Sequence, residues 1–508
     1  MLKRLLNTTS LKANIIANFG GNAWSALINL IFVPVYLKYI GAEGYGLIGI
    51  FASLQIVLSL LDSGLSTTLN KELARLNVLP AMEQKMRNLV KTLGSIYWII
   101  ALFAGLIAIF LSPLLAKFWV HPQHLSIQTI TYSFILLSIS IVFQFPIGFY
   151  TGGILGLQRQ VMLNVLQVVF ATLKSAGAVL ILLFVSKSVL AFFSWTVAIT
   201  VLQAFTYKYV LWFYLPPAHV KGIFDKHELK GISRFAAGIT GISLTAILLT
   251  QIDKIILSKI LSLDQFGYYT ISCSLGMMIY QVISPLAQSY FPKFSGLASL
   301  NLKKELAHLY HQACQSISIL VFPVTFTMIF FSRELIFIWT KSHITAENTW
   351  LITAIYAYGT GMNGLMAIPA ILTLSYGWTK LGFYQNIAFL IILIPLTIFL
   401  ALTYGAVGGA LSWAIINTLY FFITPHFIHR RLLKGELAAW YWEDSLKPIF
   451  MCLIIIGAAK YFFGSTVYSN LKELFLIGGI AMTCVICVFL LTGDFNKNIM
   501  NIIKKTRS

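Results

Sequence analysis

Long apolar runs follow one another along the whole chain, and only short polar stretches separate them. A helix needs roughly 20 apolar residues to cross the hydrocarbon core of a bilayer, whereas a strand of a membrane barrel alternates apolar and polar residues over about ten. The pattern therefore predicts an all-α polytopic membrane protein with about 14 transmembrane helices. The expected spans are residues 13–37, 44–70, 90–115, 126–152, 161–186, 188–214, 232–258, 266–291, 307–331, 348–375, 380–402, 405–428, 445–464 and 470–492.

The composition agrees with a membrane protein. The chain has 508 residues, of which 58% are hydrophobic and 10% are charged, and its mean hydropathy is +0.82. Soluble domains carry about 25% charged residues, so a soluble protein is excluded. The loops are too short to bury a core of their own, and the sequence has no HExxH, GxxxxGK[ST] or Gly-x-Ser-x-Gly motif. We therefore expect a protein that is not an enzyme and that acts within the bilayer or at its faces.

Basic residues gather in short blocks between the apolar runs and give a formal net charge of +20. If both termini are cytoplasmic, the inner segments hold 26 of the 36 Lys and Arg residues and the outer segments hold seven. Cytoplasmic loops of membrane proteins are enriched in Lys and Arg, so this distribution predicts that both termini are cytoplasmic. The charge reflects topology, and no nucleic-acid partner is expected. The basic start of the chain lacks a small-residue cleavage motif, which predicts an uncleaved first helix.

The five cysteines lie in or beside apolar segments. Cys484 and Cys487 form a CxxC pair, but this pair lies inside an expected span. Small buried core residues are therefore favoured over a redox or metal site, and neither a metal nor a cofactor is expected.

The second half of the chain resembles the first at an offset near 220 residues, which indicates an internal duplication. The expected organisation is an N-terminal six-helix half over 1–220, a C-terminal six-helix half over 221–435, and two additional transmembrane helices with a cytoplasmic tail over 436–508. The matching residues are Phe110, Ser112, Leu115 and Trp119 with Phe330, Ser332, Leu335 and Trp339, then Gly156 and Arg159 with Gly377 and Lys380, and Ser194-Trp195 with Ser412-Trp413.

Each expected half has an even number of spans, so both halves enter the membrane from the same side. Parallel repeats of this kind are one design of secondary transporters, in which the substrate site lies between the halves and access alternates. The alternative is an old duplication in a protein without transport activity. The repeat favours a transporter.

Ionisable residues lie within the expected spans, where charge is costly and usually functional. Lys174 is midway along an apolar run and either faces a wet cavity that attracts an anion such as a phosphate, or is paired or snorkelling. Asp62 is near the inner end of its span, where a cap or a bond between helices is favoured over transport. Asp253 either faces a cavity or lies at an interface. Lys254 is expected to extend towards the membrane surface, because adjacent helical side chains point about 100° apart.

Amide and basic side chains give further candidates. The amides could bind sugar hydroxyls, although ties between helices are favoured. Lys71, Arg75 and Arg87 form an expected cytoplasmic basic face, which topology explains and which could also gather anionic lipid headgroups. The candidate amides are Asn22, Gln55, Gln144 and Gln251.

Five motifs stand out, namely Asn18 to Trp24, Pro34 to Gly46, Leu60 to Leu65, Gln251 to Lys254, and Gly405 to Ala410. They resemble the Wzx-type oligosaccharide flippases, the polysaccharide transporter family of the multidrug/oligosaccharidyl-lipid/polysaccharide exporter superfamily. The resemblance covers essentially the whole chain and is strongest in the first, second, seventh and eighth expected spans. Its motifs identify a family and no particular substrate.

The resemblance implies a flippase of the bacterial inner membrane that moves undecaprenyl-pyrophosphate-linked oligosaccharide repeat units across the bilayer by alternating access. Such units feed the assembly of lipopolysaccharide O-antigen, capsule or exopolysaccharide. Membrane lipids, a polysaccharide polymerase and a chain-length regulator are the further partners that it implies. Coupling to an H⁺ or Na⁺ gradient would supply energy, with Asp62 or Asp253 as the coupling carboxylate and Lys174 as the phosphate contact.

Two relatives within the superfamily are alternatives. Lipid II flippases also have fourteen helices, but they carry arginines in a central cavity, and the first, second and eighth expected spans have no interior Arg. Ion-coupled multidrug exporters usually have twelve helices, so the pair over 445–492 argues against them. A membrane-embedded glycosyltransferase or polymerase is the alternative from another class, and the short outer loops argue against it.

Overall fold

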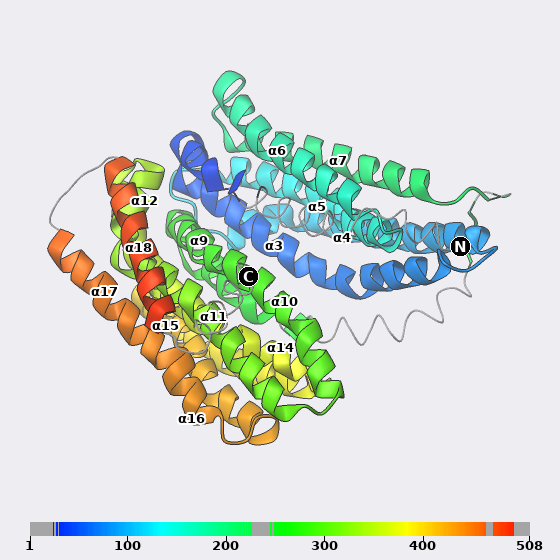
Figure 1. Cartoon of the computed structure of the whole chain (residues 1–508). Helices are drawn as coiled ribbons and strands as arrows, with labels where there is room; N and C mark the ends of the chain where they lie inside the picture. Colours follow the sequence, from blue (N-terminus) through cyan, green and yellow to red (C-terminus); the bar gives the residue numbers. More distant parts are fainter. Residues whose placement is uncertain are drawn as a thin grey trace. The chain divides into compact units, whose positions relative to one another are not determined.

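The computed structural model describes residues 24, 27–28, 30–218, 220, 222–225, 244–245, 248–463 and 471–491, and for residues 58–65, 282, 471 and 491 it describes the backbone only. By their internal contacts the residues form two units, Met1–Gly267 and Tyr268–Ser508. The predicted halves over 1–220 and 221–435 refer to the sequence repeat and stay a prediction. Each unit is a bundle of long helices (Figure 1).

The described secondary structure is helical apart from one isolated bridge between His121 and Ser262. Eleven helical stretches in the described part of the chain are long and apolar enough to cross a membrane. They contain twelve of the predicted spans, because Thr379–Arg431 joins the two spans predicted over 380–402 and 405–428. The first and seventh predicted spans lie mostly outside the described residues. The predicted all-α polytopic membrane fold is confirmed.

The first unit is built around one central helix, which packs against three others. Buried aromatic rings fill the space around it, and the ring of Tyr97 lies 5.1 Å from that of Phe145 and 4.7 Å from that of Phe149. The central helix is α5 (Ile127–Gly156), its neighbours are α3 (Val33–Leu76), α4 (Glu83–Phe118) and α7 (Val189–Tyr214), and α6 (Gln160–Phe184) packs mainly on α7 (Figure 1).

The second unit is organised around α11 (Lys303–Phe330), most of whose side chains beyond the first turn are buried. Its neighbours include the last two long helices, which are the additional pair that the sequence predicts. The remaining elements are α9 (Leu263–Gly276), α10 (Met278–Ser299), α12 (Ser332–Thr340), α13 (His343–Leu365), α14 (Ala367–Ser375), α15 (Thr379–Arg431), α16 (Leu437–Ala439), the π-helical stretch η1 (Trp440–Leu446), α17 (Lys447–Phe463) and α18 (Leu471–Leu491).

Two of the long helices are interrupted by a glycine in the left-handed backbone region. Gly41 breaks α3 with φ 70°, and Gly405 breaks α15 with φ 60°. Glycine adopts this conformation without the strain that a Cβ atom would cause. Both breaks fall where the apolar pattern predicts the end of one span and the start of the next, so each interrupted helix combines two predicted elements.

In each unit, one long helix begins with the same hydrogen-bonded cap. In α5, Ser126 accepts a hydrogen bond from the N–H of Thr129, and the Ser133 hydroxyl donates to the Thr129 carbonyl. In α13 the corresponding bonds join Ser342, Thr345 and Thr349 in the same order, 216 residues later. A repeated cap of this kind supports the predicted duplication.

The turn after α5 and the turn after α14, the helix that follows α13, are also equivalent. Gln158 (φ 58°) and Gly377 (φ 66°) are both left-handed, and in each turn the next residue donates its N–H to the carbonyl five residues earlier. The sequence match pairs Gly377 with Gly156, whereas the turn geometry pairs it with Gln158. The structure thus moves the match by two residues, because backbone conformation and not residue type defines the equivalent position.

Candidate functional site

Lys174 lies on α6 with its ammonium directed at an amide of α5. Its Nζ is 3.4 Å from Oε1 of Gln144, and both side chains are partly buried. Two residues predicted separately from the sequence are therefore neighbours. Among the described residues, no carboxylate lies within ion-pair distance of Lys174. The ammonium donates one of its three N–H groups to the oxygen of Gln144, so its charge has no opposite partner among the described residues.

Hydrogen bonds from neighbouring helices fix the backbone around Lys174. The hydroxyl of Tyr36 donates to the carbonyl of Ser175 at 3.0 Å, and Nε1 of Trp195 donates to the carbonyl of Leu173 at 3.0 Å. These bonds come from α3 and α7, on the two residues that flank the lysine. The backbone that carries the lysine is consequently held at a defined position, and the contact with Gln144 directs the ammonium.

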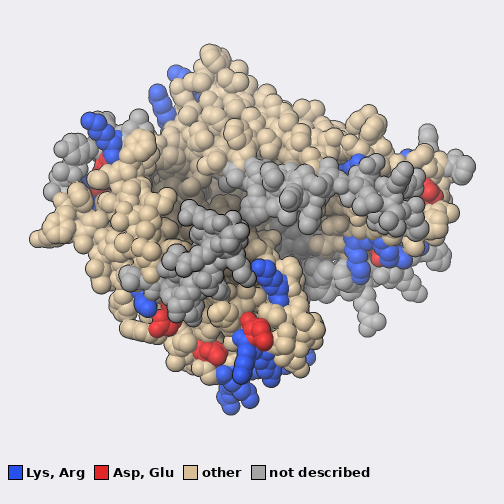
Figure 2. Space-filling view, viewed as in Figure 1, with Lys and Arg blue, Asp and Glu red and all other residues tan. Residues whose placement is uncertain are grey.

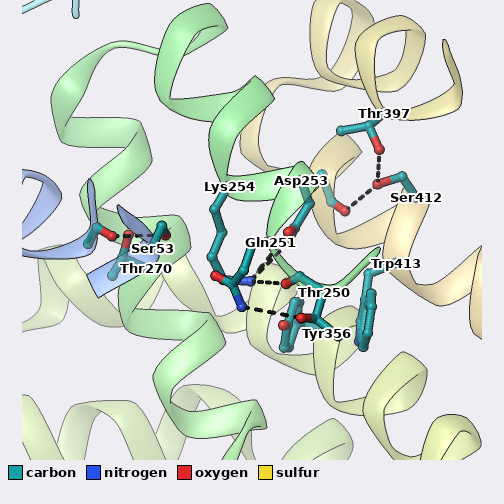
Figure 3. Close-up of polar contacts among 12 residues, drawn as sticks. Ser53, Thr250, Gln251, Asp253, Lys254, Thr270, Tyr356, Thr397, Ser412 and Trp413 are labelled. Atoms are coloured by element: carbon teal, nitrogen blue, oxygen red, sulfur yellow. Dashed lines mark hydrogen bonds and ion pairs between the residues drawn. The ribbon is translucent and has the colours of Figure 1, made fainter. Parts of the chain in front are cut away.

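The second charged candidate, Asp253, is paired within its own helix over 248–260 (Figure 3). Its side chain is 1% exposed, and both carboxylate oxygens are 3.3 Å from Nζ of Lys254. Lys254 also donates to the carbonyl of Thr250 at 3.2 Å. The prediction that Lys254 extends towards the membrane surface is wrong, because four methylenes are long enough to turn the ammonium back onto the adjacent carboxylate. A coupling role for Asp253 stays a prediction.

Gln251 precedes this pair and is 4% exposed. Its Nε2 is 3.5 Å from the hydroxyl of Thr250, and its Oε1 has no partner among the described residues. A buried amide oxygen without a partner loses its hydration, which costs about 1–3 kcal/mol. Gln251 therefore offers an acceptor to a ligand or a water.

One carboxylate, which is not among the predicted site residues, accepts hydrogen bonds from three backbone N–H groups. Glu43 accepts from Gln123, from His124 at 2.9 Å and from Leu125 at 2.6 Å, although it is 4% exposed. In the sequence it resembles an ordinary acid near a loop. Only the folded chain brings the 121–125 loop against it.

The same region contains a close approach of two backbones, which we name the Glu43 seam and define as residues 41–46, 118–125 and 258–267. A Cβ atom on Gly46 would lie 2.6 Å from the carbonyl oxygen of Leu263, and one on Gly267 would lie even closer to that of Ala42. The two contacts are related by exchange of residues 221 positions apart. The N–H of Leu263 also donates to the His121 carbonyl at 3.0 Å. The seam therefore joins segments that the repeat makes equivalent, and glycine is needed on both sides.

The predicted basic face is only partly available to a ligand. Arg75 is bonded to Glu72 at 2.7 Å, and Arg87 donates to the carbonyls of Pro216 at 2.7 Å and Leu215 at 3.2 Å. Arg87 thus fixes the end of α7 on α4, whereas Lys71 is exposed. On the face shown in Figure 2, Lys and Arg side chains gather in patches, and wide described areas carry no Lys, Arg, Asp or Glu.

The structure tells less about the remaining predicted site residues. Gln55 is half-buried on α3. Asn22 and the side chain of Asp62 lie outside the described residues. Their predicted roles stay predictions.

A neutral polar network in the second unit was not predicted. The hydroxyl of Tyr280 donates to Asn363, whose Nδ2 donates to Oδ1 of Asn417 at 2.5 Å. Trp413 donates from Nε1 to the hydroxyl of Thr360 at 3.1 Å, and nearby Thr397 bonds Ser412 at 3.0 Å (Figure 3). Neutral groups of this kind are common between membrane helices, so the sequence gives no signal that separates them from packing residues.

Solved structures of membrane transporters have the same fold. A lipid II flippase, MurJ, in an inward closed conformation has a TM-score of 0.75 at 14% identity, over 96% of this chain and 99% of that one. An inward-facing multidrug resistance MATE family transporter of the MOP superfamily has a TM-score of 0.66 at 12% identity, over 80% and 95% of the two chains. At these identities the similarity shows the fold alone.

A curated protein of Shigella flexneri, "Putative O-antigen transporter", is 21% identical over 181 residues. The match covers 36% of this chain and 42% of that protein, which is less than half of its length. A family model, polysaccharide biosynthesis protein, matches residues 11–298, which is more than half of the chain. The chain belongs to the polysaccharide biosynthesis protein family and is a multi-pass membrane protein.

Proposed function

We propose that the protein is a flippase that moves polyprenyl-pyrophosphate-linked oligosaccharide repeat units across the bacterial inner membrane, with both termini in the cytoplasm. The observation that carries this proposal is the ammonium of Lys174, held by the neutral Gln144 at membrane depth in a member of a polysaccharide biosynthesis family. The family indicates the class of substrate. The uncompensated cation suits its pyrophosphate.

The physical problem of such transport is the headgroup. A pyrophosphate and several sugars lose their hydration in the hydrocarbon core, at a cost that only hydrogen bonds and opposite charge offset. Lys174 supplies the charge, and Gln144 and Gln251 supply amide groups of the kind that bind sugar hydroxyls. The polyprenyl chain needs no polar path, because it stays in lipid.

Release on the outer side requires a second element, and the Glu43 seam is our candidate for it. With both termini inside, residues 41–46, 118–125 and 258–267 lie on the outer face. The bonds of Glu43 to three N–H groups and the contacts of Gly46 and Gly267 close that face. Alternating access would separate them. A polysaccharide polymerase and a chain-length regulator would then use the exported units, for O-antigen, capsule or another exopolysaccharide.

The test is reconstitution of the purified protein into liposomes with three kinds of substrate: polyprenyl-pyrophosphate oligosaccharides, lipid II and cationic dyes. The accessibility of each headgroup on the two leaflets is followed over time. We expect the oligosaccharide lipids to flip at least tenfold faster than in protein-free liposomes, and faster than lipid II. Movement of lipid II alone, or of dyes alone, would contradict the proposal and favour one of the two relatives in the superfamily.

A further inference from the structure

A histidine in the second unit joins two carboxylates, one open to solvent and one buried. Nε2 of His311 is 3.2 Å from Oε2 of Glu436, and its Nδ1 is 2.5 Å from Oδ2 of Asp444. The side chain of Glu436 is 38% exposed, that of His311 is 15% exposed and that of Asp444 is 1% exposed. The three groups therefore form a continuous line of hydrogen bonds from the surface into the protein.

Asp444 lies within the π-helical stretch η1, which begins the additional helix pair. Its Oδ1 accepts from Nε2 of Gln315 at 3.0 Å, and its backbone carbonyl accepts from the hydroxyl of Ser318 at 2.5 Å. Three residues of α11, His311, Gln315 and Ser318, thus form hydrogen bonds to Asp444 of η1. Short π-helical segments are frequently functional, because they are retained despite their poorer geometry.

We propose that Glu436, His311 and Asp444 form a proton relay that loads Asp444 from the face of the membrane on which Glu436 lies. This inference rests on the proposed transport function and supplies its coupling ion. A proton from water reaches Nε2 of His311 by way of Glu436, and the imidazolium then passes its Nδ1 proton to Oδ2 of Asp444. The products are a neutral imidazole that carries the new proton on Nε2 and a neutral carboxylic acid, so the number of protons balances.

The chemistry of these groups favours a proton over another ligand. Imidazole can take up one proton at one nitrogen and release another at the opposite nitrogen, and it titrates near neutral pH. No cluster of metal-ligating residues occurs in the described part of the chain. Oε1 of Gln315 is buried without a partner in that same part, so the amide that binds Asp444 also carries an acceptor that a newly formed carboxylic acid or a water can use.

Other titratable groups face the relay from each neighbouring element. Tyr310 and Cys314 approach from α11, and Glu443 approaches from η1. His429 of α15 bonds the Pro425 carbonyl through Nδ1 at 2.8 Å, so that nitrogen carries a proton. Among the titratable groups described here, His311 is the one whose ring nitrogen bonds a carboxylate oxygen of Asp444, which makes it the source of the proton.

Protonation of Asp444 would weaken the attachment of η1, and of α17 after it, to α11. A charged Asp444 binds His311 and Gln315 strongly, because hydrogen bonds to an ionised acceptor are about twice as strong as neutral ones. A protonated Asp444 holds them more weakly and loosens η1 from α11. Since α17 follows η1 directly, the relay gives proton binding a mechanical consequence in the second unit.

Two measurements test the relay. In liposomes with a luminal pH dye, we expect addition of a lipid-linked oligosaccharide to drive proton movement in the wild type, and Asp444→Asn to abolish it. We also expect the flipping rate of Asp444→Asn to be the same with and without an imposed pH gradient. Glu436→Gln should slow the proton movement several-fold, since Nε2 then takes protons from water alone. Proton movement in Asp444→Asn at the wild-type rate would overturn the proposal.

Glu443→Gln and His426→Gln are matched controls. Glu443 is a neighbouring carboxylate paired with Lys447, and His426 bonds the Phe422 carbonyl and lies against the ring of Tyr441. Both variants should keep the wild-type response to the gradient. If Asp444→Asn does not fold, His311→Gln replaces it, with the same expected result.

The second measurement does not depend on transport. Acidification of the purified protein should produce a carboxylic acid C=O band in difference infrared spectra, and this band should be missing in Asp444→Asn and present in Glu443→Gln. Identical bands in all three proteins would overturn the relay. Failure of every lipid to flip, together with a band specific to Asp444, would contradict the proposed function and leave proton binding in place.

Discussion

Two lysines at membrane depth differ in the partner of their ammonium group. Lys254 lies 3.3 Å from both oxygens of Asp253, whereas Lys174 lies 3.4 Å from the neutral oxygen of Gln144. The first charge is neutralised within one helix and serves the fold. The second has no carboxylate partner among the residues that the structure describes, so its charge is available there to an anion. A buried charge therefore indicates function only when its partner is known.

The largest effect on stability is expected at the paired lysine. Lys254→Met removes the ammonium beside a carboxylate that is 1% exposed. Breaking a buried ion pair costs about 3–5 kcal/mol, so the thermal unfolding temperature should fall clearly. The double variant Asp253→Asn with Lys254→Met should recover most of the loss. A single variant as stable as the wild type would show that the pair contributes nothing.

Giving Lys174 a carboxylate partner like that of Lys254 should have an intermediate effect. Gln144→Glu places a carboxylate beside Lys174 and neutralises it, so anion binding should weaken by about 1.5–3 kcal/mol, the value of a hydrogen bond to a charged group. We expect flipping to slow by roughly 10- to 100-fold, since about 1.4 kcal/mol corresponds to a factor of ten. The unfolding temperature should stay the same or rise. Rapid flipping by this variant would mean that the charge of Lys174 does no transport work.

The smallest effect is expected at the Glu43 seam, where backbone N–H groups hold the carboxylate and the change adds one methyl group. Gly46→Ala places a methyl group 2.6 Å from the Leu263 carbonyl, and overpacking of this kind costs about 1–3 kcal/mol. The seam should open more often, which a cysteine placed at Val120, 2% exposed in the closed seam, would report by faster labelling from outside. Gly478→Ala is the control, because nothing lies within 4 Å of its added methyl group. Equal labelling in both variants would show that the close approach does not hold the seam.

The sequence predicted the helical fold well, because apolar length alone determines which segments cross a membrane. It even placed the breaks at Gly41 and Gly405, which appear as interruptions between expected spans. It also selected Lys174 and Gln144 as separate candidates. Their contact could not be predicted, since it joins α5 and α6 across 30 residues.

The groups that each charged side chain contacts could not be predicted from the sequence. The direction of Lys254 was wrong because helical geometry fixes the Cβ atoms and not the end of a flexible side chain. Glu43 and the His311 relay were missed because their partners are backbone N–H groups or residues more than 120 positions away. Such sites depend on tertiary packing, which a single sequence without an alignment does not report.

The most direct test of the central claim compares two substrates in liposomes, an oligosaccharide linked to the polyprenyl chain through pyrophosphate and the same glycan linked through a single phosphate. The wild type should flip the pyrophosphate form faster. Lys174→Gln should slow that form by roughly 10- to 100-fold and reduce the difference between the two, through loss of a charged hydrogen bond. Lys208→Gln, which changes an exposed lysine on α7, should match the wild type. Wild-type rates and an unchanged preference in Lys174→Gln would contradict the account.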